Sequence, residues 1–362
     1  MHNDFRRIPY RWRLRYGYYQ YFDHFLGRKL FFKLTHKGRR KFYKRLHKFL
    51  KNCGPAKIID VPRIENITQT EFLDKYVKKQ KPVIISGFAK DWKCCQNWSL
   101  DYFQELHGTD KILFVNQENV DESPVTETTL GEVIDQIKKG ENNYYRFYPL
   151  LKMHPEHILD VDYKWLRKGR LKGGLGEGFQ VFISGKGGFT PVHSASANNI
   201  FTQVHGEKEW YLYPFDYTCI IDPDPVRNLS RSAPTRNGVV FDPFDDLYDQ
   251  HELYQYMDGY KAHLKPGDVF FNPGFMWHTV KNPTESIGMG YRYLTPFQSL
   301  YRAPLYSFLE YFTWKPPIWR SWKNYDDINM IHLAETGKLK EIAKTRGVKR
   351  IKSTVELTDK EN

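Results

Sequence analysis

Two histidines and one lysine, His193, His278 and Lys208, lie in strand-like segments rich in β-branched and aromatic residues. A neutral imidazole is the commonest metal ligand in proteins, and an ammonium group pairs well with a carboxylate. A lone histidine, however, is more often a core or surface group than a ligand. The motifs around these residues therefore have to decide whether they do chemistry.

A dense motif surrounds the first histidine, from Thr190 to Pro214. It resembles the pattern of the JmjC and cupin-like oxygenases, T-P-x-H followed at fixed intervals by N, Q, G-x-K-x-W and L. The matching positions are Thr190, Pro191, His193, Asn199, Gln203, Gly206, Lys208, Trp210 and Leu212. The segment from Lys265 to Val280 resembles the same family's P-G-D and Trp-His strand pair. With the lead-in at residues 81–99, the resemblance covers roughly residues 65–297.

The resemblance implies a mainly β fold with added α structure, namely a double-stranded β-helix (jelly roll) with helical additions at both ends. In such oxygenases two histidines and one carboxylate bind one face of Fe(II) and leave room for 2-oxoglutarate and oxygen. The family pattern assigns the metal to His193 and His278. It assigns the cosubstrate to Thr190, Lys208, Asn199 and Tyr145, the last through a loose Tyr-Tyr-Arg match.

The sequence departs from the family at the residue two positions after His193. Ala195 stands where the metal-binding Asp belongs, and its methyl group cannot ligate a metal. Three hypotheses follow. The site has degenerated and the protein is a binding or scaffold module; a chloride fills the ligand position, as in the iron halogenases with His-x-Ala or His-x-Gly, and a C–H bond is halogenated; or a water or a carboxylate from elsewhere completes the site of a hydroxylase.

The composition predicts a globular protein. Hydrophobic residues make up 40% of the 362 residues and aromatic residues 16%, which excludes a disordered chain. No apolar run reaches the length of a membrane-spanning helix, and the N-terminus carries arginines in place of a signal core. The four cysteines show neither disulfide density nor zinc-site spacing. We therefore expect a cytoplasmic protein, with peripheral membrane association as an alternative.

Most of the positive charge lies in an aromatic-rich N-terminal arm, residues 1–57. Residues 1–52 contain 16 Lys or Arg against 2 Asp or Glu, a net charge of +14 in a chain whose total is +13. Apolar residues at helical spacing from Phe42 to Leu50 predict a basic amphipathic helix. This helix could pack on the domain, contact an anionic membrane surface or an acidic protein, or bind nucleic acid.

Changes in residue composition along the chain predict the remaining domain boundaries. Residues 58–297 form the JmjC/cupin-like domain, 298–340 a helical extension and 341–362 a polar tail. The C-terminal helices are expected to pack on the barrel or to form a homodimer surface. Residues 214–264 read as a long loop that could wall the substrate site. The substrate stays open among a peptide or protein, an RNA and a small metabolite.

Overall fold

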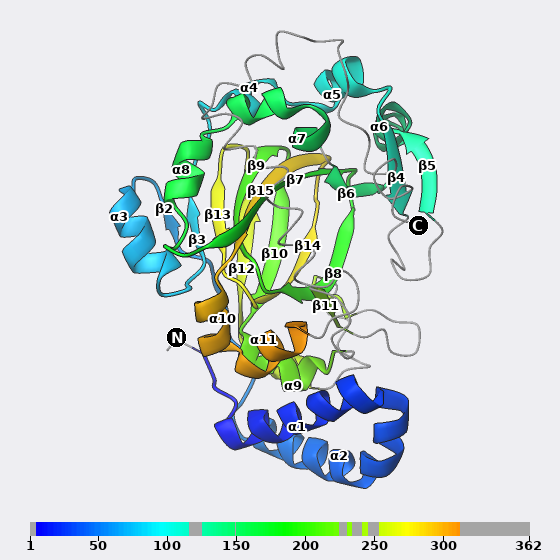
Figure 1. Ribbon diagram of the computed structural model, residues 1–362, viewed down its shortest axis with the longest axis vertical. Helices are drawn as coiled ribbons and strands as arrows, with labels where there is room; N and C mark the ends of the chain where they lie inside the picture. The colour runs from blue at the N-terminus through cyan, green and yellow to red at the C-terminus, as the bar shows by residue number, and fades with distance from the viewer. Residues whose placement is uncertain are drawn as a thin grey trace.

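Two β-sheets face each other and form the body of the protein (Figure 1). The computed structural model describes residues 5–115, 125–148, 150–223, 230–233, 241–244 and 253–311. The larger sheet has the strand order β2-β3-β13-β9-β15-β7-β6, and the smaller has the order β1-β12-β10-β14-β8-β11. A separate pair, β4 and β5, lies outside them. Only β1–β12 and β2–β3 are parallel among the described strand pairs.

The strands are short and follow one another closely from residue 175 onward. Those of the larger sheet are β2 (Arg63–Ile64), β3 (Val83–Ile85), β6 (Tyr144–Tyr148), β7 (Leu175–Ser184), β9 (Asn198–His205), β13 (Val269–Asn272) and β15 (Ser286–Leu294). Those of the smaller sheet are β1 (Ile58–Asp60), β8 (Phe189–Ala195), β10 (Lys208–Tyr213), β11 (Ser230–Ser232), β12 (Gly259–Leu264) and β14 (Trp277–Lys281). The outer pair is β4 (Lys111–Val115) and β5 (Val125–Thr129). The predicted jelly-roll core with helical additions is confirmed.

Side-chain alternation divides each strand between the barrel interior and the outside. In β7, Phe182 belongs to the interior cluster with Phe201, Trp210 and Phe270, whereas its neighbour Ile183 belongs to the outer cluster. Glycines in β15 make room for this interior: a Cβ on Gly288 would lie 2.2 Å from the Phe201 ring. Aromatic side chains therefore fill much of the barrel interior, and polar side chains occupy only some of its inward-facing strand positions.

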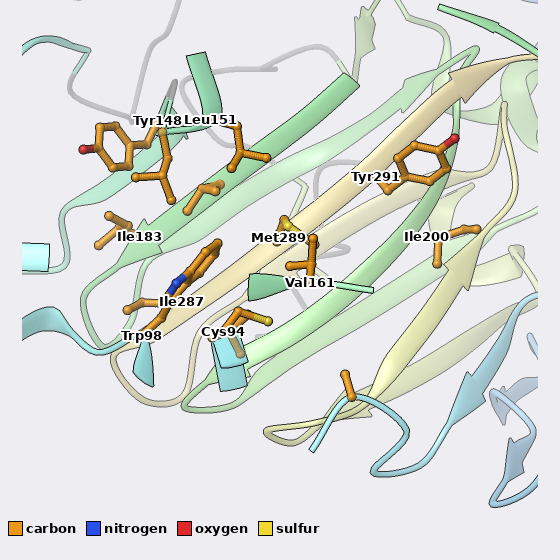
Figure 2. Packing of buried hydrophobic residues seen from close by; sticks show 14 of the residues in the cluster. Cys94, Trp98, Tyr148, Leu151, Val161, Ile183, Ile200, Ile287, Met289 and Tyr291 are labelled. Carbon is orange, nitrogen blue, oxygen red and sulfur yellow. The ribbon is translucent and has the colours of Figure 1, made fainter. Parts of the chain in front are cut away.

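The outer face of the larger sheet is covered by short helices (Figure 1). Figure 2 shows Ile287, Met289 and Ile183 of β15 and β7 packing against Cys94 of α4 and Trp98 beside it. The covering elements are α3 (Gln69–Glu71), the π-helical turn Phe72–Val77, α4 (Lys93–Asn97), α5 (Leu100–His107), α6 (Leu130–Lys138), α7 (Leu150–Met153), the 3-10 turn Pro155–Asp160 and α8 (Tyr163–Lys168). Buried apolar side chains from both layers make this the main core.

At one end of the barrel the N-terminal arm forms a helical hairpin of α1 (Tyr10–Leu26) and α2 (Arg28–Lys51), joined at Gly27 (Figure 1). Gly27 has φ 83°, a conformation that favours glycine and allows the sharp reversal. Tyr16, Leu46 and their neighbours share a buried cluster with barrel-end residues such as Trp277. The arm therefore packs on the domain through one face.

Two expectations about chain organisation change. The stretch from 214 to 264 is not one irregular loop, because it contains α9 (Thr218–Ile221), β11 and β12 within its described parts. Helix α1 was not anticipated, since its apolar residues surround it with little periodicity. The C-terminal extension begins with α10 (Pro296–Arg302) and α11 (Pro304–Tyr311); the rest of it and the 341–362 tail lie outside the described residues. Within the described part of the chain, no helix is both long and apolar enough to cross a membrane.

Candidate active site

The two predicted metal ligands meet inside the barrel. His193 of β8 and His278 of β14 are direct partners in the antiparallel register, and their ring centroids lie 4.1 Å apart. The His278 ring also stacks on interior Trp210 at 5.6 Å. Two residues 85 positions apart in the chain thus bring their imidazole rings together, as the binding of one metal requires.

Hydrogen bonds set the orientation of both rings. Nδ1 of His193 donates to the carbonyl of Pro191, and Nδ1 of His278 donates to the carbonyl of Met276, each at 2.9 Å. Because Nδ1 carries the proton, Nε2 is the ring nitrogen with the lone pair, which is the usual arrangement of metal-binding histidines. Burial also lowers the pKa of His278 to about 4, so its ring is neutral at physiological pH.

Ala195 lies two residues further along β8 and offers no side-chain donor. Its carbonyl accepts a hydrogen bond from the Phe275 N–H at 2.7 Å, and it pairs with Ser230 of β11. No carboxylate joins the two histidines in a metal-type grouping anywhere in the described ranges. The residues present therefore fit two of the three protein positions of an iron facial triad and leave the third without a protein ligand.

Along β14 the site continues inward from His278 through Val280 to Asn282, just beyond the strand end. Lys208 of β10 is fully buried and donates to Oδ1 of Asn282. Burial lowers the pKa of Lys208 to about 7. Desolvation penalises the charge of a buried lysine, and a carboxylate bound beside it would stabilise that charge. The deep end of the barrel thus holds a cation suited to a carboxylate.

Thr190 lies between the histidine end and the Lys208 end of the site. A bulge in the β8–β14 register pairs it with Val280, an interior residue. The opposite wall places Asn199 of β9 directly against Asn272 of β13 and Arg292 of β15. The predicted residues His193, His278, Thr190, Lys208 and Asn199 therefore all face one interior.

Several polar atoms of this interior have no hydrogen-bond partner in the protein. They are Oγ1 of Thr190, Oδ1 of Asn199, Nε1 of Trp210 and Oδ1 of Asn272. Buried polar groups are almost always hydrogen-bonded, since an unsatisfied one costs about 1–3 kcal/mol. Donors and acceptors on facing walls fit a polar cosubstrate such as 2-oxoglutarate, with its carboxylate toward Lys208.

Arg292 is a site residue that the sequence analysis missed. Its guanidinium lies 5.7 Å from the Phe182 ring inside the barrel, and its charge helps to lower the pKa of His278 after the larger effect of burial. The signal was present: in β15, Arg292 shares the alternation of Gly288 and Gly290, opposite to the outward Met289. A second cation therefore stands near the metal end.

The structure does not bring Tyr145 to this group. Tyr145 lies on β6 opposite Ile183, an outer-face residue, and its ring is 5.8 Å from that of Tyr148. Burial, and secondarily the charge of Asp110, raises the pKa of Tyr145. Its hydroxyl thus belongs to the outer layer.

A different His–Asp–His cluster lies in that outer layer, at the end of α5 and after α7. Metal-capable atoms of His107, Asp110 and His154 lie within 4.8 Å of one another. Nε2 of His154 and the Tyr148 hydroxyl both donate to Oδ2 of Asp110, at 2.6 and 2.7 Å, and Nε2 of His107 lies 2.7 Å from Nε2 of His157. These are hydrogen-bond distances, whereas ligand atoms around a tetrahedral metal lie about 3.3 Å apart.

Comparison with known proteins decides the family. The Cupin-like domain family matches residues 69–299, more than half of the chain. The protein belongs to this JmjC/cupin-like family. The family generally uses Fe(II) and 2-oxoglutarate, and the matched region contains every residue of the barrel site.

Curated relatives are distant. "Arginine-specific demethylase JMJ22" of Arabidopsis thaliana is 24% identical over 65% of this chain and 46% of its own length. "tRNA wybutosine-synthesizing protein 4" of Gibberella zeae is 27% identical over 64% of this chain and 23% of its own length. Human "HSPB1-associated protein 1" is 25% identical over 56% of this chain and 45% of its own length. The cupin-like protein described here thus spans less than half the length of each of these relatives.

Proposed function

We propose that this cupin-like protein is a 2-oxoglutarate- and Fe(II)-dependent oxygenase in which an exogenous ligand replaces the missing carboxylate. The carrying observation is the pair His193 and His278, whose Nδ1 atoms are both committed to backbone carbonyls while the rings converge. A decayed site has no reason to retain this orientation together with a buried lysine. The names of the demethylase relatives agree with oxidative chemistry.

Each residue then has a role. His193 and His278 hold the iron, Lys208 pairs with the distal carboxylate of 2-oxoglutarate, and Thr190 donates to it. Asn199 hydrogen-bonds the cosubstrate from the opposite wall. Bound iron with 2-oxoglutarate and dioxygen would supply the oxidant for a C–H bond of the substrate, with succinate and carbon dioxide as coproducts. The substrate stays open among a peptide or protein, an RNA and a small metabolite.

The ligand beside Ala195 has to be small and, for charge balance, anionic. A carboxylate ligand normally neutralises part of the iron charge, and Arg292 adds a further positive charge to this end of the site. Chloride satisfies both conditions, and with it the reaction becomes halogenation; with water it remains hydroxylation. The rival function is a cupin-like binding or scaffold protein, which the absence of the carboxylate favours.

Anaerobic titration with Fe(II) and 2-oxoglutarate, with and without chloride, tests the proposal. We expect the visible metal-to-ligand charge-transfer band to form, and to strengthen with chloride if a halide completes the site. Iron-dependent succinate formation in air then separates an enzyme from a binding module. No band in either condition, from folded protein, overturns the proposal in favour of the binding module.

A matched variant sharpens the result. Ala195→Asp restores the ordinary ligand set, so it should bind Fe(II) more tightly and lose any chloride dependence. If wild type and Ala195→Asp both fail to form the band while circular dichroism shows them folded, the barrel does not bind iron through these histidines.

A further inference from the structure

The outward side of the α1–α2 hairpin exposes an unusual amount of apolar surface. Eight of the sixteen exposed large hydrophobic side chains in the described chain lie on these two helices. They are Tyr10, Leu14, Tyr18, Phe25, Leu26, Leu30, Phe32 and Leu34, and Leu34 is 73% exposed. A group of exposed apolar residues on one element marks an interaction surface rather than ordinary scatter.

These residues concentrate at the closed end of the hairpin. Phe25 and Leu26 end α1, Leu30 and Leu34 follow in the first turns of α2, and the glycine turn lies between them. Tyr18 continues the apolar stripe along α1. The tip therefore exposes apolar side chains, and the exposed lysines begin within it at Lys33 and continue along α2 with Lys37 and Lys41.

The charge of the hairpin is almost entirely positive. Residues 10–51 contain 14 Lys or Arg and one acid, Asp23, a net charge of +13 that equals the formal charge of the whole chain. Asp23 is buried and pairs with Arg28 and Arg39, so it does not offset the outer charge. The exposed face consequently presents Lys33, Lys37 and their neighbours without an acidic counterpart on these helices.

Ion pairs fix the hairpin on the barrel and leave this face outward. Arg28 bridges Asp222, and Arg13 pairs with Asp216 at 2.6 Å. The buried sides of both helices join the barrel-end cluster. Figure 1 shows α2 as the outermost element of this end, with α1 between it and α9.

We propose that this face docks the protein on an anionic lipid bilayer, with the apolar tip in the interface and the α2 cations on the lipid phosphates. Interfacial helices combine an apolar strip with Lys and Arg in this way. An RNA partner fits less well, because half of the eight exposed apolar side chains are leucines, which offer no ring on which a base could stack, and two of these leucines are among the most exposed. The proposal does not depend on the iron chemistry of the barrel.

A groove beside the same helix adds a place for headgroups. It has a volume of about 610 Å³ and lies along α2, where Arg40, Lys44 and His36 line it together with Phe32 and Tyr43. Cations above an aromatic floor suit a phosphate with an apolar attachment.

Vesicle flotation of the full chain tests the proposal, with phosphatidylcholine vesicles and with phosphatidylcholine–phosphatidylserine vesicles. We expect binding to the anionic vesicles that weakens with salt, and little binding to the neutral ones. A Leu30→Trp variant should show a blue-shifted emission with the anionic vesicles, because the new indole enters the interface.

Three variants separate the contributions. Lys37→Glu and Lys41→Glu should each weaken binding at least about fivefold, the contribution of one surface cation. Leu30→Ser with Leu34→Ser should reduce binding while salt sensitivity remains. Leu106→Ser, which changes an exposed leucine on α5, is the control and should bind like the wild type.

Equal binding of all variants, or no binding to anionic vesicles, overturns the proposal. So does tight binding of a single-stranded RNA oligomer that displaces the vesicles, or a stable dimer that hides Leu34 from the lipid. Every one of these assays can be run on His278→Ala protein, so failure here is distinct from failure of the iron site.

Discussion

The barrel site and the outer His–Asp–His cluster form an instructive contrast. The barrel has two histidines and lacks the carboxylate, because Ala195 stands in its place. The outer cluster has both ligand types in His107, Asp110 and His154. By residue type alone, the outer cluster is the better metal site.

Hydrogen bonding reverses that ranking. In the barrel each Nδ1 donates to a backbone carbonyl, which fixes the orientation of the His193 and His278 rings, and their centroids lie 4.1 Å apart. In the outer cluster Nε2 of His154 and the Tyr148 hydroxyl donate to the Asp110 carboxylate, and Nε2 of His107 is hydrogen-bonded to Nε2 of His157. The difference teaches that a metal site is defined by where the lone pairs point and by what already uses them.

The largest expected effect separates the two groups of histidines. His278→Ala should weaken Fe(II) binding by more than about 100-fold, because losing a direct ligand lowers metal affinity more than losing a group that only orients a ligand. His154→Ala should leave Fe(II) binding unchanged. Both are measured by the anaerobic charge-transfer titration, and loss of the band in the His154 variant would break the comparison.

The outer cluster should instead govern stability. Asp110→Asn should lower the free energy of unfolding by about 2 kcal/mol, because it removes the charge-assisted acceptor of two buried donors. Asp91→Asn, an exposed substitution, is the control and should change it by less than about 0.5 kcal/mol. Urea denaturation followed by circular dichroism gives both values.

The pH dependence of this effect follows from the pKa of Asp110. Burial alone would raise that pKa, but the hydrogen bonds from His154 and Tyr148 outweigh burial and hold it below the ordinary value. A carboxyl whose pKa is depressed on folding stabilises the protein above its unfolded pKa of about 4, and the contribution is lost as the pH falls. The gap between wild type and Asp110→Asn should therefore shrink below about pH 4. A chelator-induced loss of stability in a His193→Ala/His278→Ala background would show that the outer cluster binds metal after all.

A smaller effect is expected at the deep end of the barrel. Lys208→Met should weaken 2-oxoglutarate binding about 10- to 100-fold, since it removes a charge-assisted hydrogen bond. Lys186→Met, on an exposed turn, should have no effect. Calorimetry in the presence of Fe(II) under anaerobic conditions measures the affinity, and an unchanged value would assign Lys208 a purely structural role.

Lys208 should also couple cosubstrate binding to proton uptake. Its pKa of about 7, lowered by burial, means that it is largely neutral at pH 8, and a bound carboxylate would restore the ammonium form. Binding should therefore weaken as the pH rises above about 7. Calorimetry at pH 8 in buffers of different ionisation enthalpy detects the proton, which should disappear in Lys208→Met.

The smallest expected effects compare an interior residue, Thr190 of β8, with an outer-layer residue, Tyr145 of β6. Thr190→Val should weaken 2-oxoglutarate binding by about 2- to 10-fold, the contribution of a neutral hydrogen bond. Tyr145→Phe should change it by less than about twofold, since Tyr145 lies with the outer residues. A larger effect for Tyr145 would mean that the cosubstrate site extends through the sheet.

The fold class and several local features could be predicted from the sequence because short motifs depend on interactions between residues close together in the chain. Short local motifs mark two helix starts: Thr68 and Glu71 form a capping box before α3, and Ser99 caps α5. The motif around His193 and the family resemblance it carries predicted the jelly roll. Ala195 also showed from sequence alone that a protein carboxylate is missing from the expected position.

The tertiary structure decided what depends on strand register and on face. Tyr145 and Arg292 illustrate this. The motif suggested Tyr145 as a site residue, but its pairing with Ile183 places it on the outer face. Arg292 lies on the inner face because side chains alternate along β15. Residues two apart in a strand point to the same face of the sheet, but a one-residue shift in register, or a bulge, moves the following side chains to the other face. The sequence by itself determined the fold class, the two histidines and the unusual alanine. Only the folded chain determined which polar groups share the interior and which face of the basic hairpin stays outward, because these depend on contacts between segments far apart in sequence.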